Sequence, residues 1–132
     1  MRSKMLAISI KMRYSRQVVS KKGGLILNHF YAGTFMNRKE LEEMGIKYPV
    51  KLEYYKTESE VSNKNNIKET KFGIEVIKTS YIKEEVKVEN SKITEIAKDE
   101  RIVDKILEIL KRNEVTPVCA EYIVEDLLKE IG

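Results

Sequence analysis

Residues 99–132, DERIVDKILEILKRNEVTPVCAEYIVEDLLKEIG, decide the fold. Apolar residues recur at the three- and four-residue spacings of one helix face on both sides of residues 113–117. Asp99 is a suitable N-cap for the first helix, and Pro117, preceded by Thr116, is a suitable first residue of the second. The stretch therefore predicts two short amphipathic helices joined by a hinge, as an antiparallel or strongly angled pair.

These helices need a further apolar surface, because isolated helices of this length are marginally stable in water. Alternating apolar and polar residues upstream predict strands at residues 48–55, 71–77, 81–88 and 92–97. The side chains expected to face the helices are Val50, Leu52, Tyr54, Phe72, Ile74, Val76, Val86 and Val88. The polar residues 57–70 predict a long solvated loop, and residues 89–91 predict a turn. Gly73 predicts a bulge or a close approach of two backbones.

A short helix is predicted before the strands, with Asn37 as N-cap, Glu40 as its capping-box partner and Gly45 as terminator. Short connections between the last strands favour antiparallel pairing. The predicted fold class is α+β: an antiparallel three- to four-stranded meander with one face covered by a C-terminal αα-hairpin. On the outer face we expect Tyr55 and Ile77 to be exposed, which leaves a homo-oligomer open.

A sequence of 132 residues is long enough for one domain with its own core. The single cysteine, Cys119, allows no disulfide within the sequence and favours a reducing, cytoplasmic location. We expect this cysteine to be a small core residue beneath the helix pair, although a helix N-terminus also suits a reactive thiol. No run of residues is long and apolar enough for a membrane span, so we expect no membrane partner.

The net charge of +4 is unevenly distributed. Residues 1–39 contain nine Lys or Arg residues and no acid, whereas the remaining 93 residues contain sixteen basic and twenty-one acidic residues. We therefore divide the chain into residues 1–35, a basic N-terminal extension, and residues 36–132, a single α+β domain. The extension is expected to be poorly ordered or not part of the natural product.

Translated upstream DNA would explain such an extension. Lys22-Gly23-Gly24 can be encoded by a purine-rich, ribosome-binding-like stretch, and so can residues 32–35, directly before Met36. A transit peptide is a weaker interpretation, because the alternation at the N-terminus is strand-like and not helical. The third alternative is an arm that neutralises nucleic-acid phosphates. Its contact residues would be Arg2, Lys4, Lys11, Arg13, Arg16, Lys21 and Lys22.

No catalytic, cofactor-binding or metal-binding set is predicted. His29 is the single histidine, so no second imidazole completes a zinc site. Adjacent carboxylates such as Glu84 and Glu85 diverge on a strand or helix. No glycine-rich phosphate-binding pattern occurs either. We therefore do not expect an enzyme.

The strand Lys71-Phe72-Gly73-Ile74-Glu75-Val76-Ile77 and the hinge Asn113-Glu114-Val115-Thr116-Pro117-Val118 carry a resemblance. Over about residues 48–128, the chain resembles a family of small uncharacterised bacterial proteins, a domain of unknown function. Its members have a Tyr/Phe-Gly-Ile strand and an Asn-x-Val-x-Pro turn between two final helices. The resemblance supports the fold and implies no catalytic or binding residue.

We expect a non-enzymatic accessory or regulatory domain that binds another macromolecule, most simply a protein partner. The alternative is a nucleic-acid-binding module that uses the basic N-terminal arm.

Overall fold

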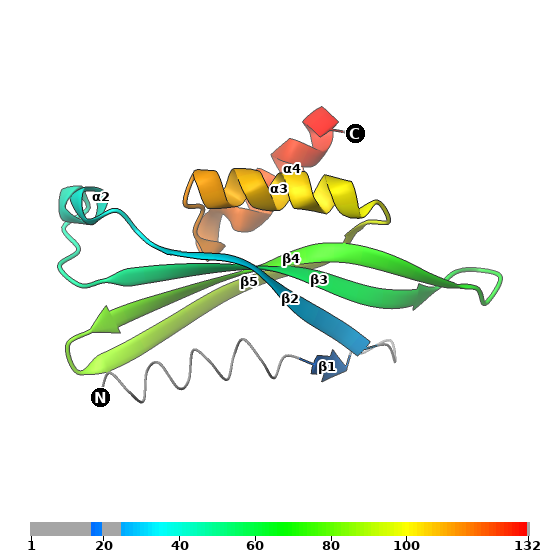
Figure 1. Cartoon of the computed structure of the whole chain (residues 1–132), viewed down its shortest axis with the longest axis horizontal. Coiled ribbons are helices and arrows are strands. Elements are labelled where there is room, and N and C mark those ends of the chain that lie inside the picture. Colours follow the sequence, from blue (N-terminus) through cyan, green and yellow to red (C-terminus); the bar gives the residue numbers. More distant parts are fainter. Residues whose placement is uncertain (1–16, 20–24, 132) are drawn as a thin grey trace.

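The computed structural model describes residues 17–19 and 25–131. Within them, five antiparallel strands form one sheet in the order β1-β2-β3-β4-β5, and α3 and α4 lie on one face (Figure 1). The elements are β1 (Gln17–Val19), β2 (Leu25–Phe35), α2 (Arg38–Glu43), β3 (Val50–Ser62), β4 (Lys68–Ile82), β5 (Glu85–Ala97), α3 (Glu100–Arg112) and α4 (Pro117–Ile131). The predicted α+β meander with a C-terminal helix pair on one face is confirmed.

Strands β3 and β4 form a hairpin much longer than predicted. Their register runs without a break from Val50↔Ser80 to Ser62↔Lys68. The turn is built by Asn63, whose side-chain oxygen accepts from the N–H groups of Asn65 and Ile67 at 2.9 and 3.0 Å. The predicted loop over residues 57–70 is therefore wrong, because polar residues continue both strands up to an Asx-type turn.

Strand β5 is continuous, so the predicted turn at residues 89–91 is also wrong. The preceding turn lies at residues 83–84, where Ile82 is registered with Glu85. The bulge predicted at Gly73 is confirmed by a register shift between Phe72 and Ile74. A Cβ on Gly73 would lie 2.2 Å from the carbonyl oxygen of Ile93, so two backbones meet there and only glycine fits.

Asp99 is the N-cap of α3, as predicted, and its side chain accepts from the N–H of Arg101 at 3.0 Å. The Arg101 side chain and this N–H hold the pKa of Asp99 below its ordinary value. At the other end, Glu114 adopts a φ of 49°, and the N–H of Val115 donates to the carbonyl of Leu110 at 3.0 Å. These contacts form a Schellman-type end with glutamate in the place that glycine favours.

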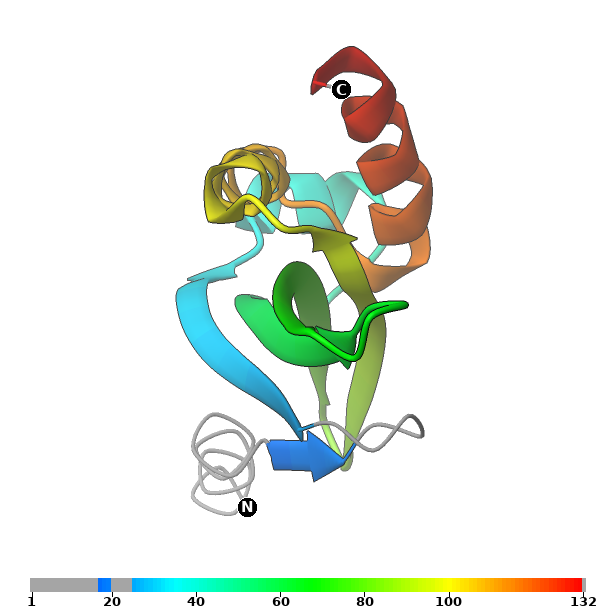
Figure 2. The ribbon, with the colours of Figure 1, turned by 90° about the vertical axis from the view of Figure 1, so that its right-hand side faces the viewer.

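Helix α4 begins at the predicted proline and is steeply inclined to α3. Figure 2 shows α3 nearly end-on while α4 rises beside it. Of the two predicted arrangements, the strongly angled pair is therefore present. Helix α3 packs over β3 and β4, and α4 packs over β4 and β5.

The core lies between the sheet and these two helices. Its buried residues are Leu52, Tyr54, Ile74, Val76, Val103, Ile106, Leu107, Leu110, Val115, Ala120 and Val124. Strand β5 contributes Ile93, Ile96 and Ala97. Val86 and Val88 were predicted on this face, but their register with Tyr81 and Thr79 places them on the opposite one. The error follows from the missed turn at residues 83–84, since a shift in register exchanges the two faces of a strand.

The outer face of the sheet also departs from expectation. Tyr55 and Ile77 were predicted to be exposed, but both are fully buried. The ring of Phe30 packs edge-on against Tyr55, with centroids 5.6 Å apart. These two side chains therefore do not supply the exposed surface that a homo-oligomer was expected to use.

The cysteine prediction is wrong as well, because Cys119 is exposed. Ala120 and Val124, four residues apart, turn toward the core, and Cys119 lies about 100° around the helix from Ala120.

Residues 25–35, assigned from the sequence to the N-terminal extension, form β2 and pair with β3. The start of the natural product stays a prediction.

Candidate functional site

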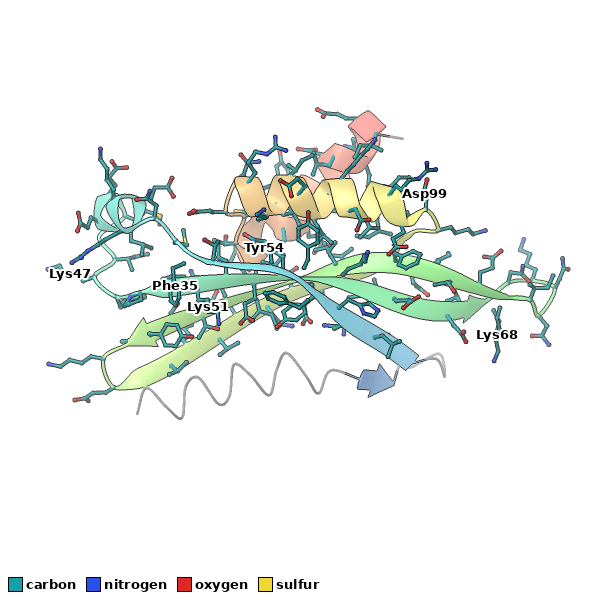
Figure 3. All side chains as sticks on the ribbon, viewed as in Figure 1. Phe35, Lys47, Lys51, Tyr54, Lys68 and Asp99 are labelled. Atoms are coloured by element: carbon teal, nitrogen blue, oxygen red, sulfur yellow. The ribbon has the colours of Figure 1, made fainter. Side chains whose placement is uncertain are left out.

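A groove of about 800 Å³ lies between α2 and the adjoining ends of β2 and β3. Its apolar lining residues are Phe35, Met36, Leu41, Ile46, Tyr48, Pro49 and Val50. Arg38, Glu42 and Lys47 complete the lining with charged groups. We call this the α2 groove. Figure 3 shows Phe35 and Lys47 at this end of the molecule, beside α2.

Local signals hold α2 in place. The side chain of Asn37 accepts from the N–H of Lys39 at 2.8 Å, as predicted for an N-cap. The reciprocal contact differs from the prediction, because the N–H of Asn37 donates to Glu114 at 3.3 Å and not to Glu40. The hinge between α3 and α4 thus replaces the local capping-box partner and ties α2 to the helix layer.

The end of α2 shapes the wall of the groove. Gly45, with a φ of 75°, allows the N–H of Ile46 to donate to the carbonyl of Leu41 at 2.8 Å. Leu41 and Ile46 both line the groove. The predicted terminator is therefore confirmed, and it also places two apolar side chains on one wall.

Large apolar side chains remain exposed at this end of the molecule. Phe35 is 58% exposed and Met44 is 57% exposed. The ring of Phe35 lies 6.2 Å from that of Tyr81, which orients it without covering it. The surface is therefore apolar and partly preformed, as binding grooves usually are.

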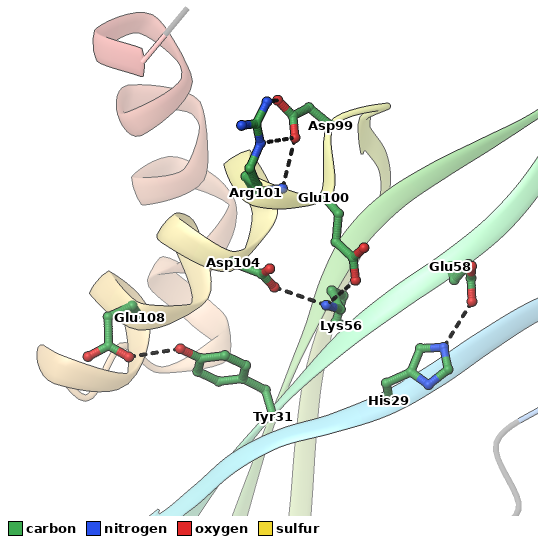
Figure 4. A network of polar contacts seen from close by, with 9 residues as sticks. All are labelled: His29, Tyr31, Lys56, Glu58, Asp99, Glu100, Arg101, Asp104 and Glu108. Atoms are coloured by element: carbon green, nitrogen blue, oxygen red, sulfur yellow. Dashed lines mark hydrogen bonds and ion pairs between the residues drawn. The ribbon is translucent and has the colours of Figure 1, made fainter.

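A separate polar network joins the sheet to α3 (Figure 4). The ammonium group of Lys56 lies 2.5 Å from Glu100 and 3.0 Å from Asp104. Burial lowers the pKa of Lys56, but hydrogen bonds to the two carboxylates outweigh it, so the pKa lies above its ordinary value. This network fixes the orientation of α3 on β3.

Farther along α3, the hydroxyl of Tyr31 donates to Glu108 at 2.8 Å. This hydrogen bond raises the pKa of Tyr31 and lowers the pKa of Glu108. Tyr31 is the extra residue at a bulge between β2 and β3, which lets its side chain reach the helix.

His29 lines a smaller groove of about 380 Å³, together with residues that include Tyr31 and Lys56. Its Nε2 is 3.0 Å from a carboxylate oxygen of Glu58. No contact joins His29 to Cys119 within the described residues, and the two lie on different elements, β2 and α4.

The outer face of the sheet carries a buried polar cluster. Glu53 and Glu75 are each 1% exposed. Glu53 accepts from the hydroxyl of Tyr55 at 3.0 Å. Glu75 accepts from the side-chain amide of Asn90 at 3.0 Å and from that of Asn28. We call these five residues the outer-face cluster.

The predicted nucleic-acid contacts cannot be placed. Arg2, Lys4, Lys11, Arg13, Arg16, Lys21 and Lys22 all lie outside the described residues. Within the described part, no three His, Cys, Asp or Glu side chains gather closely enough to hold a metal ion. None of the helices there is both long enough and apolar enough to cross a membrane.

Sequence reasoning missed both the α2 groove and the outer-face cluster. For the groove a signal was present, because the apolar residues Met36, Leu41 and Ile46 stand within and beside a helix of only six residues, which contains a single buried side chain, that of Leu41. For the cluster the signal was weaker. Glu53 and Glu75 each stand inside an apolar or aromatic run, but one sequence does not show that both strands are buried on two faces.

Comparison with known proteins places the chain in a family. No curated protein and no solved structure matches it. Residues 34–130, from the end of β2 to the end of α4, match the Family of unknown function (DUF6514). The match includes the strand and the hinge that carried the resemblance in the sequence, as well as the whole α2 groove. The chain therefore belongs to this family of unknown function.

Proposed function

We propose that the chain is a non-catalytic accessory or regulatory domain that binds a protein partner through the α2 groove. The occupant is a segment of the partner with an apolar side chain beside an acidic one. The main support for this proposal is the groove itself, whose lining is mostly apolar and whose charged groups include Arg38 and Lys47.

The apolar contribution comes from side chains that already stand in water. Phe35, which lines the groove, is 58% exposed. Covering a large apolar side chain stabilises a complex by up to about 1.5–3 kcal/mol before ordering costs are subtracted. An aromatic or long aliphatic anchor in the groove would therefore provide most of the affinity.

The charged groups favour an acidic neighbour for that anchor. Arg38 pairs with Glu42 at 3.6 Å, but both side chains are largely exposed, so this pair is weak. Lys47 lines the groove and is exposed. A carboxylate of the partner would pair with Lys47 and compete with Glu42 for Arg38. These two charge contacts would fix the position of the bound segment along the groove.

Selection from a library of random linear peptides on the full chain tests the proposal. Enriched peptides should combine an aromatic or aliphatic anchor with Asp or Glu. Lys47→Glu should weaken their binding about tenfold or more, since one lost ion pair and one new repulsion exceed about 1.4 kcal/mol. The matched control is Lys129→Glu, an equal charge change at an exposed position of α4. Equal weakening by both variants, or no enrichment, would contradict the proposal.

We also propose a cytoplasmic location in a bacterial cell. The resemblance noted in the sequence and the single, exposed thiol of Cys119 support it, because a reducing compartment keeps such a thiol free. Fractionation of the source cells tests this, and recovery outside the cytoplasm would exclude it.

A further inference from the structure

We propose that two copies of this chain associate through β5, the strand at one edge of the sheet. The two β5 strands run antiparallel, so that the sheets of the two copies join into one. Val88 of each copy lies opposite Val88 of the other. This edge is separate from the α2 groove, so the dimer does not depend on the binding proposed there.

The first observation is the open edge of β5. In the order of the described strands β5 is terminal, and it pairs with β4 alone. An edge strand presents backbone N–H and C=O groups that a strand of another chain can pair with, and many edges are blunted by proline or by bulges. Strand β5 contains no proline, and its register with β4 shifts only after Ile93, next to Glu95, whose φ is 58°. Residues 85–93 therefore form a regular edge.

The hydrogen bonds of the sheet show which backbone groups of β5 point outward. The N–H of Tyr81 on β4 donates to the carbonyl of Pro49, before β3, at 3.0 Å. Backbone groups alternate in direction along an antiparallel strand, so those of Ser80 point toward β5, where Ser80 is registered with Lys87. The backbone groups of Lys87 therefore point toward β4, and those of Val88 point away from the sheet.

The helix layer covers a different part of β5. The residues of this strand that pack against the helices are Ile93, Ile96 and Ala97. Residues 85–91 lie at the other end of the strand, in a hairpin with β4 that extends away from α3 and α4 (Figure 1). Val88 is 40% exposed there. None of the described helices therefore separates this edge from a second strand.

Charge complementarity selects the register centred on Val88. In this register, Lys87 of each copy lies opposite Glu89 of the other. Because the backbone groups of Val88 form the central hydrogen-bonded pair, the flanking Lys87–Glu89 pairs are of the other kind, in which facing side chains lie closest. The two side chains already lie 3.4 Å apart within one copy. A register centred on Lys87 or on Glu89 would place that charge opposite itself, which destabilises a strand pair.

The size of the contact sets its strength. Pairing over residues 85–91 uses far fewer residues than the roughly 20–30 on each side of a standard protein interface. We therefore expect a reversible dimer that dissociates at about micromolar concentration or above. The two-fold symmetry repeats every contact, so each substitution at this edge acts twice.

Sedimentation equilibrium of charge variants of the full chain tests the pairing. Lys87→Glu and Glu89→Lys should each weaken dimerisation about tenfold or more, because each places two pairs of like charges across the contact. Combining the two substitutions restores both opposite-charge pairs, so this double variant should dimerise like the wild type. The control is Lys68→Glu, an equal charge change at an exposed position at the far end of β4 (Figure 3). A wild type that stays monomeric at every concentration, or a double variant as weak as the single ones, would overturn the proposal.

Thiol cross-linking in a Cys119→Ser background, which lacks the exposed natural thiol, tests the register. Val88→Cys places two thiols across the central pair, where the Cα atoms lie about 5.5 Å apart, a separation that suits a disulfide. Val86→Cys is the matched control, because residue 86 lies opposite residue 90, and its two thiols are therefore more than about 13 Å apart. On oxidation, Val88→Cys should form covalent dimers about tenfold faster than Val86→Cys. Equal rates for the two variants would exclude this register.

Discussion

The hydroxyl of Tyr54 donates to the backbone carbonyl of Val115 at 2.9 Å, and both residues are buried. The bond joins the middle of β3 to the hinge between α3 and α4. In Figure 3, Tyr54 lies between the sheet and the helix layer. Burial raises the pKa of Tyr54, so the phenol stays protonated as the donor. One side chain thus fixes where the helix pair sits on the sheet.

Tyr54→Phe tests this link, because it keeps the ring and removes only the donor. The buried carbonyl of Val115 would lose its partner, at a cost of about 1–3 kcal/mol in the free energy of unfolding. Urea denaturation monitored by circular dichroism measures the change. Tyr122→Phe is the control, since Tyr122 is exposed on α4 and its variant should unfold like the wild type.

Leu107→Ala tests the core beneath α3. Leu107 is fully buried in the cluster that joins α3 to the sheet, so the cavity should cost about 2–5 kcal/mol. Leu127 on α4 is only partly buried, and Leu127→Ala should cost about half as much. The urea concentrations at the midpoints of unfolding of the two variants provide the comparison, provided that the dependence of the unfolding free energy on urea concentration is the same for both. A larger loss at Leu127 would mean that α4 contributes more to the core than its burial indicates.

Gly73→Ala tests the close approach of β4 and β5. The new methyl group would lie 2.2 Å from the carbonyl oxygen of Ile93, which is a backbone atom and cannot rotate away. We expect a loss above about 3 kcal/mol. Gly45→Ala separates this clash from backbone strain, because Gly45 has a positive φ but no atom within 4 Å of an added Cβ. It should cost only about 1–2 kcal/mol.

Local signals allowed the helices to be predicted from the sequence. Asp99, Pro117 and Gly45 each act within one helical turn, so their effects do not depend on distant residues. The length and pairing of the strands were harder to predict than the helices. Thr57 and Ser59 are polar residues typical of loops, and yet they are buried in β3. Only pairing with β4, formed across the Asn63 turn, makes a strand of that segment.

The candidate sites could not be predicted for the same reason. The α2 groove needs residues of β2, α2 and β3 to meet, and the partner of the Asn37 N–H comes from Glu114, far along the chain. The outer-face cluster needs Asn28, Glu75 and Asn90 from three strands in register. Periodicity indicates which face a residue takes within its own element, but not which residue stands opposite.

The pair of Tyr31 and Glu108 predicts a pH effect with a definite sign. The hydrogen bond from Tyr31 lowers the pKa of Glu108 in the folded state. A lowered folded-state pKa stabilises the fold above the pKa of the unfolded chain, and this stabilisation is lost as the pH falls through the folded-state value. Tyr31→Phe should therefore raise the pKa of Glu108 toward its ordinary value and make the free energy of unfolding depend less steeply on pH in the acid range.

NMR titration of the Glu108 carboxyl measures the change in its pKa. Glu69 is the control, because Lys98 and Asn63 lower its pKa at a distant hairpin and should still do so in the variant. An unchanged Glu108 titration would show that Lys111 and not Tyr31 stabilises the carboxylate.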